Sequence, residues 1–494
     1  MRNLLASHTK LEFDNKSSSK ERSDLEHIFH PRSVVVAGIS SKGGGIALAL
    51  LAPLLRCGFK GRVYALNPKG GEFWGMNIHS SLKDIPGPVD YVIVCIPAHL
   101  TPQLMEDCVA KGVKVVSIFT AGFSELGDAE GAKLEARIVE IARRGGIRVL
   151  GPNCWGIYNP KENLCFAHDF PIEAGNVGFL GQSGGNSGYA VRIGCVRGLR
   201  FSKVVSYGNA CDIDESDLLE YFAHDTETKI IGAYIEGVKD GRRFLAALEE
   251  AARAKPVIII KGGRKKAGAE AAASHTGVLV SSETIWDTLL KQKGVISVDS
   301  IDEMVDVALA FCNMPVPRGR NTAIIGGGGG AAVLTTDACE RAGLIVPTFS
   351  PEIRQKLQKL LPPVGTILRN PIDTQWVITV SPQQLSQIIN VLAQWDGCDL
   401  LLAHYPMDIG PILFHEIGSA SLDALIESII QSSKTCNKPM AVALHTVAYP
   451  QSWEILLKNE QRCIQAGIPV FRSVSSAAIA LNRFVKYYED RAKD

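Results

Sequence analysis

The sequence lacks an excess of charge of either sign, because 52 Lys and Arg residues face 51 Asp and Glu residues in a chain of 494. A chain without a net field does not attract nucleic acid or an anionic membrane over its whole surface. Any anionic ligand must therefore be bound at a local site. Hydrophobic residues make up 46% and charged residues 21% of the chain, which is typical of globular protein with about two to four domains.

The sequence also lacks Cys-x-x-Cys pairs and Cys/His clusters at zinc spacing, since its 12 cysteines are scattered singly. This pattern indicates neither a disulfide framework nor a metal site, and it favours a reducing, cytoplasmic location. No run approaches the roughly 18 to 20 apolar residues of a membrane-spanning helix, and the polar N-terminus has no signal-peptide core. We therefore expect a soluble intracellular protein with a flexible tail at residues 1–24.

The first stretch that we expect to be ordered lacks an intact Gly-x-Gly-x-x-Gly motif, so it gives only weak support for binding of a nicotinamide dinucleotide. It does contain a short apolar strand at Ser33–Ala37, a glycine loop at Gly38–Gly45 and an apolar helix at Ile46–Leu55. In this order, small residues let the backbone approach a phosphate at the start of a helix. The alternative is an ordinary turn of a parallel sheet.

Four more apolar strands complete a predicted first domain, residues 25–157. The strand at 63–66 ends in Asn67-Pro68-Lys69, the strand at 91–96 ends in Pro97-Ala98, and two more lie at 113–119 and 147–150. Ligands of open parallel sheets bind at such carboxyl ends. We therefore expect the ligand of this domain there.

A repeated plan follows, in which a strand, a glycine loop, a helix and a Gly-Leu pair recur. One copy runs from the strand at 177–180 through Gly181–Gly188 to Gly198-Leu199, and the other from the strand at 322–325 through Gly326–Gly330 to Gly343-Leu344. Further strands alternate with helices, at 203–206, 230–235, 257–260, 400–403, 440–444 and 468–471. This alternation predicts two tandem parallel-sheet domains, 173–315 and 320–494, and neither shows a P-loop.

Two residues are candidates for catalysis. His275 lies in the small-residue segment Ala271–Gly277, and a neutral imidazole can carry a phosphoryl group covalently. The alternative is a surface or helix-cap histidine, and Ser7-His8-Thr9 repeats the same tripeptide in the polar tail. Glu236 follows the strand at 230–235, where a carboxylate can hold one ring N–H of a histidine, although a solvated loop charge is the alternative.

The acidic segment Asn209–Asp217 looks like a metal loop but lacks the glycine and distant glutamate of an EF-hand. Capping of the following helix by its acids is the favoured interpretation. We therefore predict no metal site in this chain.

Several motifs occur together in a specific order. The chain resembles the α subunit of the ADP-forming (NDP-forming) acyl-CoA synthetases, relatives of succinyl-CoA synthetase, over nearly its whole length after the tail. The motifs that carry the resemblance are Leu150-Gly-Pro-Asn-Cys154, Gln182-Ser-Gly184, Tyr207-Gly-Asn209, Asp214-Glu215, Tyr234-Ile-Glu-Gly237, Lys239-Asp-Gly241, Lys261–Arg264, Ala271–Gly277 and Asn370-Pro-Ile-Asp373.

The resemblance implies an N-terminal Rossmann-like CoA-binding domain followed by two flavodoxin-like ligase domains. It implies that His275 is phosphorylated by an acyl phosphate and passes the phosphoryl group to ADP, with Glu236 as its support. The positions that match CoA contacts are Gly38, Ile39, Ser40, Ser41, Lys42, Gly43, Lys69, Ile96, Pro97 and Ala98. The positions that match the phosphate cradle are Gln182, Ser183, Gly184, Gly185, Asn186, Gly327, Gly328, Gly329 and Gly330.

The sequence departs from the family pattern in two respects. Five glycines replace the Asn-Ala-Gly-Gly-Pro that is common in the third-domain loop, and no stretch is typical of an ATP-grasp fold. The resemblance therefore implies a hetero-oligomer with an ATP-grasp β subunit that brings ATP or ADP and Mg²⁺. The acid substrate stays open.

Two competing functions are a nonenzymatic CoA-sensing or scaffolding subunit and an NAD-dependent dehydrogenase. A dehydrogenase is expected to carry an acidic ribose ligand where Asn67-Pro68-Lys69 stands.

Overall fold

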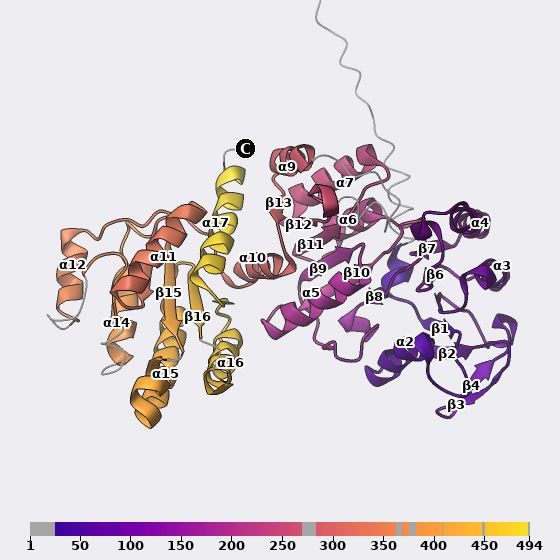
Figure 1. Cartoon of the computed structure of the whole chain (residues 1–494), viewed down its shortest axis with the longest axis horizontal. Helices are drawn as coiled ribbons and strands as arrows, with labels where there is room; N and C mark the ends of the chain where they lie inside the picture. Colours follow the sequence, from indigo (N-terminus) through magenta and orange to yellow (C-terminus); the bar gives the residue numbers. More distant parts are fainter. Residues whose placement is uncertain are drawn as a thin grey trace, which may run out of the picture. The chain divides into compact units, whose positions relative to one another are not determined.

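The computed structural model describes residues 25–268, 283–361, 368–374, 382–407, 409–446 and 450–492. They form two compact units, each of α/β type as predicted (Figure 1). Unit 1 holds residues 25–168 and 205–224, and unit 2 holds residues 169–204, 225–268 and the described residues from 283 onward.

The elements of unit 1 begin with the predicted strand and helix. Its strands are β1 Ser33–Ala37, β2 Arg62–Leu66, β3 Gly71–Phe73, β4 Met76–His79, β5 Tyr91–Val94, β6 Val115–Ile118, β7 Arg148–Leu150 and β8 Gly156–Tyr158. Its helices are α2 Gly45–Arg56, α3 Thr101–Lys111, α4 Ala129–Gly145 and α6 Glu215–His224, with short 3₁₀ turns η1 Leu82–Asp84, η2 Ala98–Leu100, η3 Ser124–Leu126 and η4 Pro160–Glu162.

The main sheet of unit 1 has the strand order β3-β4-β2-β1-β5-β6-β7. All its pairs are parallel except the β3–β4 hairpin, which the sequence did not predict. The first strand lies between β2 and β5, and Ala37 is in register with both Leu66 and Val94. The chain thus leaves β1 at the point where the strand order reverses, which is where open α/β sheets bind ligands.

The elements of unit 2 also follow the predicted alternation. Its strands are β9 Val177–Gly181, β10 Phe201–Ser206 (whose last two residues belong to unit 1), β11 Ile230–Ile235, β12 Val257–Lys261, β13 Ile296–Val298, β14 Thr322–Gly326, β15 Leu400–Pro406, β16 Met440–His445 and β17 Val470–Phe471. Its helices are α5 Gly184–Val196, α7 Gly241–Ala254, α9 Glu283–Gln292, α10 Ile301–Asn313, α11 Gly329–Ala342, α12 Pro351–Gln358, α14 Pro382–Ala393, α15 Ile409–Thr435, α16 Pro450–Gln465 and α17 Val474–Arg491.

Unit 2 contains two sheets, with the orders β13-β12-β11-β9-β10 and β14-β15-β16-β17. The first strand of the first sheet, β9, is again flanked by two others. In the second sheet β14 pairs with β15, and its Ile325 forms a further parallel bridge with Ile372. Both predicted glycine loops follow these first strands, at Gly181 and Gly326.

The predicted repeat is confirmed at the ends of the two helices. Gly198 after α5 and Gly343 after α11 have φ of 95° and 100°, a left-handed conformation that favours glycine. The amides of the buried Leu199 and Leu344 then donate to Gly194 O and Cys339 O, at 2.8 and 3.0 Å. The same stop signal therefore ends both helices.

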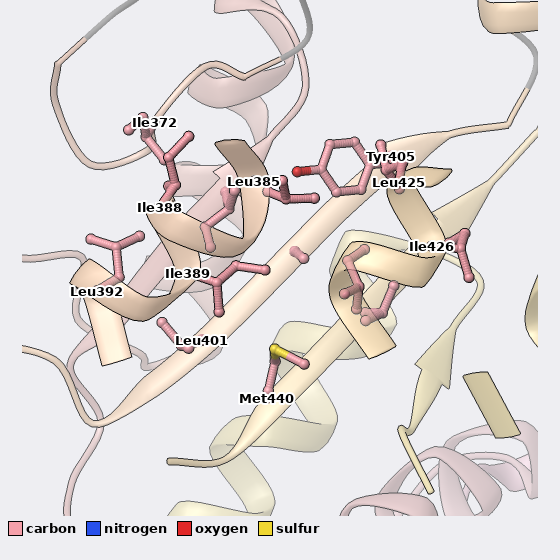
Figure 2. Packing of buried hydrophobic residues seen from close by; sticks show 14 of the residues in the cluster. Ile372, Leu385, Ile388, Ile389, Leu392, Leu401, Tyr405, Leu425, Ile426 and Met440 are labelled. Carbon is pink, nitrogen blue, oxygen red and sulfur yellow. The ribbon is translucent and has the colours of Figure 1, made fainter. Parts of the chain in front are cut away.

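Helices α14 and α15 supply much of the core of the second sheet (Figure 2). Leu385, Ile388, Ile389 and Leu392 of α14 pack with Leu401 of β15, and Leu425 and Ile426 of α15 belong to the same cluster. The spacing of the α14 residues places them on one face of the helix.

A buried ion pair joins the two sheets of unit 2. Arg197, only 4% exposed, donates from Nη2 to Asp306 Oδ1 of α10 and to the carbonyl of Val470 in β17, each at 2.7 Å. Removing one partner of such a pair leaves a buried charge uncompensated. The contact therefore fixes the sheet that bears α5 against the sheet that bears α11.

Candidate functional site

The predicted CoA loop begins at Gly38, directly after β1. Its amide donates to Leu66 O at 2.8 Å, its φ is 107°, and a Cβ there would lie 2.5 Å from Cys95 O. Only glycine fits this position, because a side chain would meet both a strained φ and a backbone oxygen. The following residues, Ile39 to Gly43, lead from this edge of the sheet into α2.

The other predicted CoA residues lie at the ends of the two neighbouring strands. Lys69 follows β2, is exposed, and its amide donates to Asn67 Oδ1 at 3.0 Å. The Ile96 carbonyl after β5 accepts from Thr120 Oγ1 at 2.7 Å, and Ala98 begins η2. The structure thus brings together, along one edge of the sheet, the residues that the resemblance assigned to CoA.

The β3–β4 hairpin adds two aromatic residues that sequence reasoning missed. A Cβ on Gly43 would lie 2.9 Å from the Phe73 ring, so the hairpin touches the loop. The ring of Phe73 lies 4.7 Å from that of Trp74, which is 63% exposed. The available signal was the Phe-Trp-Gly triplet, since Gly75 takes a turn φ of 74°.

Two motifs of the resemblance are structural in unit 1. Asn209 donates from its amide to Pro152 O at 2.9 Å and from Nδ2 to Glu135 Oε2 at 3.0 Å. A backbone hydrogen bond therefore joins the Leu150–Cys154 motif to the Tyr207–Asn209 motif. The acidic segment caps a helix as predicted, because Asp214 Oδ1 accepts from the amides of Ser216 and Asp217 at the start of α6.

In unit 2, the glycine turn after β9 is tied to Glu236. Ser183 caps α5 by accepting from the Asn186 amide at 3.3 Å. The adjacent Gln182 accepts with Oε1 from the amides of Glu236 and Gly237, at 2.6 and 3.0 Å. The turn that was predicted to cradle phosphate and the carboxylate that was predicted to assist it are therefore held together.

Glu236 is only 8% exposed, so the alternative of a solvated loop charge is wrong. The Tyr234 side chain, two residues earlier on β11, hydrogen-bonds both Glu236 and Asn186. Burial raises the pKa of Tyr234 far above its usual value, and Glu236 raises it further. Sequence reasoning gave Tyr234 no role, although residues i and i+2 share one face of a strand.

Lys261, the last residue of the next strand, and the following Gly262 lie on the other side of Glu236. Lys261 Nζ donates to the Glu236 carbonyl at 2.7 Å, and burial lowers the pKa of this lysine to about 8 while Glu236 opposes the shift. A Cβ on Gly262 would lie 2.8 Å from the Tyr234 hydroxyl. The backbone of the Lys261–Arg264 motif thus passes close to the candidate catalytic carboxylate.

His275 lies outside the described residues, which resume at Glu283. Residues on both sides of this gap form ion pairs: Lys265 with Glu283 at 2.7 Å, and Arg264 with Asp287 at 2.6 Å. Arg264 also lines a cleft of about 370 Å³ that α17 borders, where charges of both signs meet. Glu236 does not line that cleft. We therefore assign the cleft no role in the chemistry.

The second predicted phosphate turn lies between β14 and α11. Gly326 donates to Ile372 O at 3.1 Å, and Asn370 of the same segment accepts from the Ile324 amide at 2.9 Å. The Asn370–Asp373 motif thus supports the turn. Helix α11 begins at Gly329, where the glycines are exposed, so the amides of its first turn face solvent.

In the part of the chain that the structure describes, no group of His, Cys, Asp and Glu has the arrangement of a metal site. In the same part, none of the helices is both long and apolar enough to cross a membrane. None of the 12 cysteines, all of which lie in the described ranges, forms a disulfide.

Comparison with known proteins places this geometry in a family. Residues 32–160 match the CoA binding domain, and residues 174–311 match the succinyl-CoA ligase like flavodoxin domain. Over 478 residues the chain is 36% identical to acetate–CoA ligase (ADP-forming) I subunit alpha of Pyrococcus furiosus, and the match covers 95% of this chain and 99% of that protein.

The chain belongs to the ADP-forming acyl-CoA synthetase family. A second family member, the acetate–CoA ligase (ADP-forming) I of Archaeoglobus fulgidus, is 38% identical over 380 residues, and the match spans 76% of this chain but 54% of that protein. The solved dinucleotide forming acetyl-coenzyme A synthetase 1 of Ca. Korarchaeum cryptofilum, in complex with phosphate and ADP, matches 95% of this chain with a TM-score of 0.81 and 29% identity. The predicted family and fold class are therefore confirmed.

Proposed function

We propose that this chain is the CoA-binding, phosphohistidine-carrying subunit of an NDP-forming acyl-CoA synthetase. The reaction is acid + CoA + ATP = acyl-CoA + ADP + phosphate. Relatives named as acetate–CoA and 4-hydroxybutyrate–CoA ligases (ADP-forming) support this reaction class. The observation that carries the proposal is the buried Glu236, fixed at the glycine turn of α5 by Gln182 and Tyr234.

Three domains divide this work: 25–157 holds CoA, 173–315 carries the phosphohistidine segment, and 320–494 supplies the second glycine turn. The edge formed by Gly38–Gly43, Lys69 and Ile96–Ala98 takes CoA, because small residues there let the backbone approach a pyrophosphate. Exposed Lys69 supplies a cation at the same edge.

In the forward direction, ATP phosphorylates a nitrogen of His275, and ADP leaves. The carboxylate of the acid then attacks this phosphorus, which forms an acyl phosphate and frees the imidazole. The CoA thiolate attacks the acyl carbon and displaces phosphate. Glu236 accepts an N–H of the imidazole and stabilises the ring while it carries the phosphoryl group. The two glycine turns, at Gln182–Asn186 and Gly327–Gly330, bind the phosphoryl oxygens.

An ATP-grasp β subunit brings the nucleotide and Mg²⁺. The support for such a partner is that the chain matches nearly all of a protein named subunit alpha but about half of a longer relative whose name mentions no subunit. Copurification of an ATP-grasp chain from the native source tests this point, and fractionation of the same cells tests the cytoplasmic location. A full-activity preparation of this chain alone would remove the requirement.

Phosphoryl transfer is tested by incubating the complex of both chains with ATP labelled on its γ-phosphate, followed by alkaline digestion. Labelled phosphohistidine is expected in the wild type and in His224→Ala, a control at the exposed end of α6, and it is lost in His275→Ala. Glu236→Gln slows labelling without loss of fold. Label that survives in His275→Ala would contradict the proposal, and absence of label from every variant would favour a nonenzymatic CoA-binding subunit.

Calorimetry decides which nucleotide cofactor the chain binds. CoA is expected to bind the wild-type chain and NAD is not. The reverse result would favour a dehydrogenase.

A further inference from the structure

The charge of a phosphoryl group exceeds what the two glycine turns supply. A phosphoryl group carries about −1.5 to −2 charges, whereas each helix N-terminus is equivalent to about +0.5. Two turns therefore offset about half of the charge. A side chain near either turn that can become positive would offset part of the remaining charge.

His404 lies directly beneath the turn of α11. This residue of β15 is only 1% exposed. A Cβ on Gly327 would lie 2.3 Å from His404 Cε1 and 2.8 Å from Nε2. Because Cε1 is bonded to both ring nitrogens, the edge of the ring that binds protons faces the turn.

The ring is poorly satisfied in this position. Its Nδ1 has no hydrogen-bond partner among the residues that the structure describes, and Nε2 is 3.4 Å from Thr335 Oγ1 of α11. A buried polar atom without a partner costs about 1–3 kcal/mol. Nδ1 is bonded to Cε1, which faces the turn, so the ring keeps a nitrogen without a described partner next to the helix start.

The neighbours of His404 keep the ring neutral when no anion is bound. Burial, and secondarily His445 of β16, lower the pKa of His404 to about 4. On α11 the contact is the uncharged Thr335, and directly after β14 it is Gly327. Burial strongly raises the pKa of the adjacent Tyr405, and the charge of Asp373 raises it further. An anion at the turn favours the protonated ring, because an opposite charge stabilises the charged form.

We propose that His404 takes up one proton from solvent when a tetrahedral dianion binds at the N-terminus of α11, and that the resulting imidazolium is the missing cation of this turn. The bound species is the phosphoryl group of the proposed function or free phosphate, so the inference rests on that function for its biological ligand. No covalent bond forms at His404. The proton returns to solvent when the anion leaves.

Sulfate is the probe, because its charge does not change in the relevant pH range while its shape matches phosphate. Titration calorimetry of the full chain in two buffers of different ionisation enthalpy gives the protons taken up per sulfate. An imidazole whose pKa returns to about 6.5 on binding takes up about 0.7 proton at about pH 6. Sulfate affinity should fall as the pH rises toward about 8.

His404→Gln is the decisive variant, and His445→Gln is its matched control on the neighbouring strand. Uptake should vanish in His404→Gln, whose fold is checked by circular dichroism, and persist in His445→Gln. The proposal is overturned if the wild type binds sulfate without proton uptake, if sulfate does not bind at millimolar concentration, or if His445→Gln alone abolishes the uptake.

The labelling of His275 with ATP separates this inference from the proposed function. A labelled enzyme without sulfate-linked proton uptake refutes the role of His404 and leaves the phosphoryl transfer standing. Proton uptake without label refutes the transfer and leaves an anion site at α11.

Discussion

Replacement of Gly327 by alanine should destabilise unit 2. Gly327 has φ of 60°, and a Cβ there would lie 2.3 Å from Cε1 of His404. The obstacle is the ring of a side chain that is 1% exposed, so it has no free space to move into. Both the backbone conformation and the packing therefore oppose the new methyl group.

The expected cost combines these two effects. A left-handed conformation costs a non-glycine residue about 1–2 kcal/mol, and overpacking of a core costs about 1–3 kcal/mol. Gly327→Ala should thus lower the free energy of unfolding by about 2–5 kcal/mol. Urea unfolding of the full chain, followed by far-UV circular dichroism and tryptophan fluorescence, measures the shift of the transition that belongs to this sheet.

Gly330→Ala is the matched control, because Gly330 lies in the first turn of α11 with nothing within 4 Å of an added Cβ. Alanine there should be neutral or stabilise by up to about 1 kcal/mol. In the double variant Gly327→Ala/His404→Ala, the overpacking disappears, so the two changes should couple favourably by about 1–3 kcal/mol. Equal transitions for Gly327→Ala and Gly330→Ala, or strict additivity in the cycle, would refute this account of the turn.

Three further predictions concern the same sites. Tyr234→Phe removes the hydroxyl that hydrogen-bonds Asn186 and Glu236. Since a hydrogen bond to a charged group contributes about 1.5–3 kcal/mol, rapid-quench labelling of the protein with ATP should slow at least about tenfold, and an unchanged rate would exclude a positioning role. Trp74→Ala removes an exposed ring beside the predicted CoA loop. Calorimetry should show about tenfold weaker CoA binding, because base stacking contributes about 1–3 kcal/mol, whereas Trp453→Ala, on α16, should leave the affinity unchanged. The pKa of His404 in the folded chain is about 4, below its ordinary 6.5, so the stability contributed by the neutral ring is complete above about pH 6.5 and falls by about 3 kcal/mol as the pH drops toward about 4. His404→Gln should flatten this part of the pH profile of the urea midpoint, and an identical profile would show that another group titrates.

The strands that bind the candidate ligands could be predicted because each is a short apolar run that ends in glycine or proline. The run at Ser33–Ala37 is buried along its whole length and forms β1 with the predicted bounds. The hairpin strands Gly71–Phe73 and Met76–His79 escaped prediction, because they are short and mostly solvent-accessible and therefore lack an apolar pattern. Their turn brings Trp74 to the loop, so one aromatic candidate was missed for the same reason.

The side-chain partners of the site could not be predicted, because they depend on contacts between separate strands. The sequence places Glu236 after a strand, but its surroundings come from Gln182, which follows another strand, and from Lys261 on a third. His404 gave no signal, since a single histidine after an apolar run is compatible with a solvent-facing strand end. Its position under Gly327 exists only because β14 and β15 pair in register, with Gly326 opposite His404.

The two glycine turns share a plan but offer different groups to an anion. At α5 the Ser183 side chain occupies the Asn186 amide, and side chains of Gln182 and Tyr234 connect the turn to a carboxylate. At α11 the cap residue is Gly328, which provides no side-chain hydrogen bond, and the nearest ionisable group lies below the backbone at His404. The α5 turn can therefore position a group precisely but brings negative charge with it, whereas the α11 turn leaves its amides open and can gain positive charge. A phosphoryl group that contacts both turns would be oriented by the first and neutralised by the second, so substitutions at α5 should change the rate of transfer while substitutions at α11 should change the affinity for the anion and its dependence on pH.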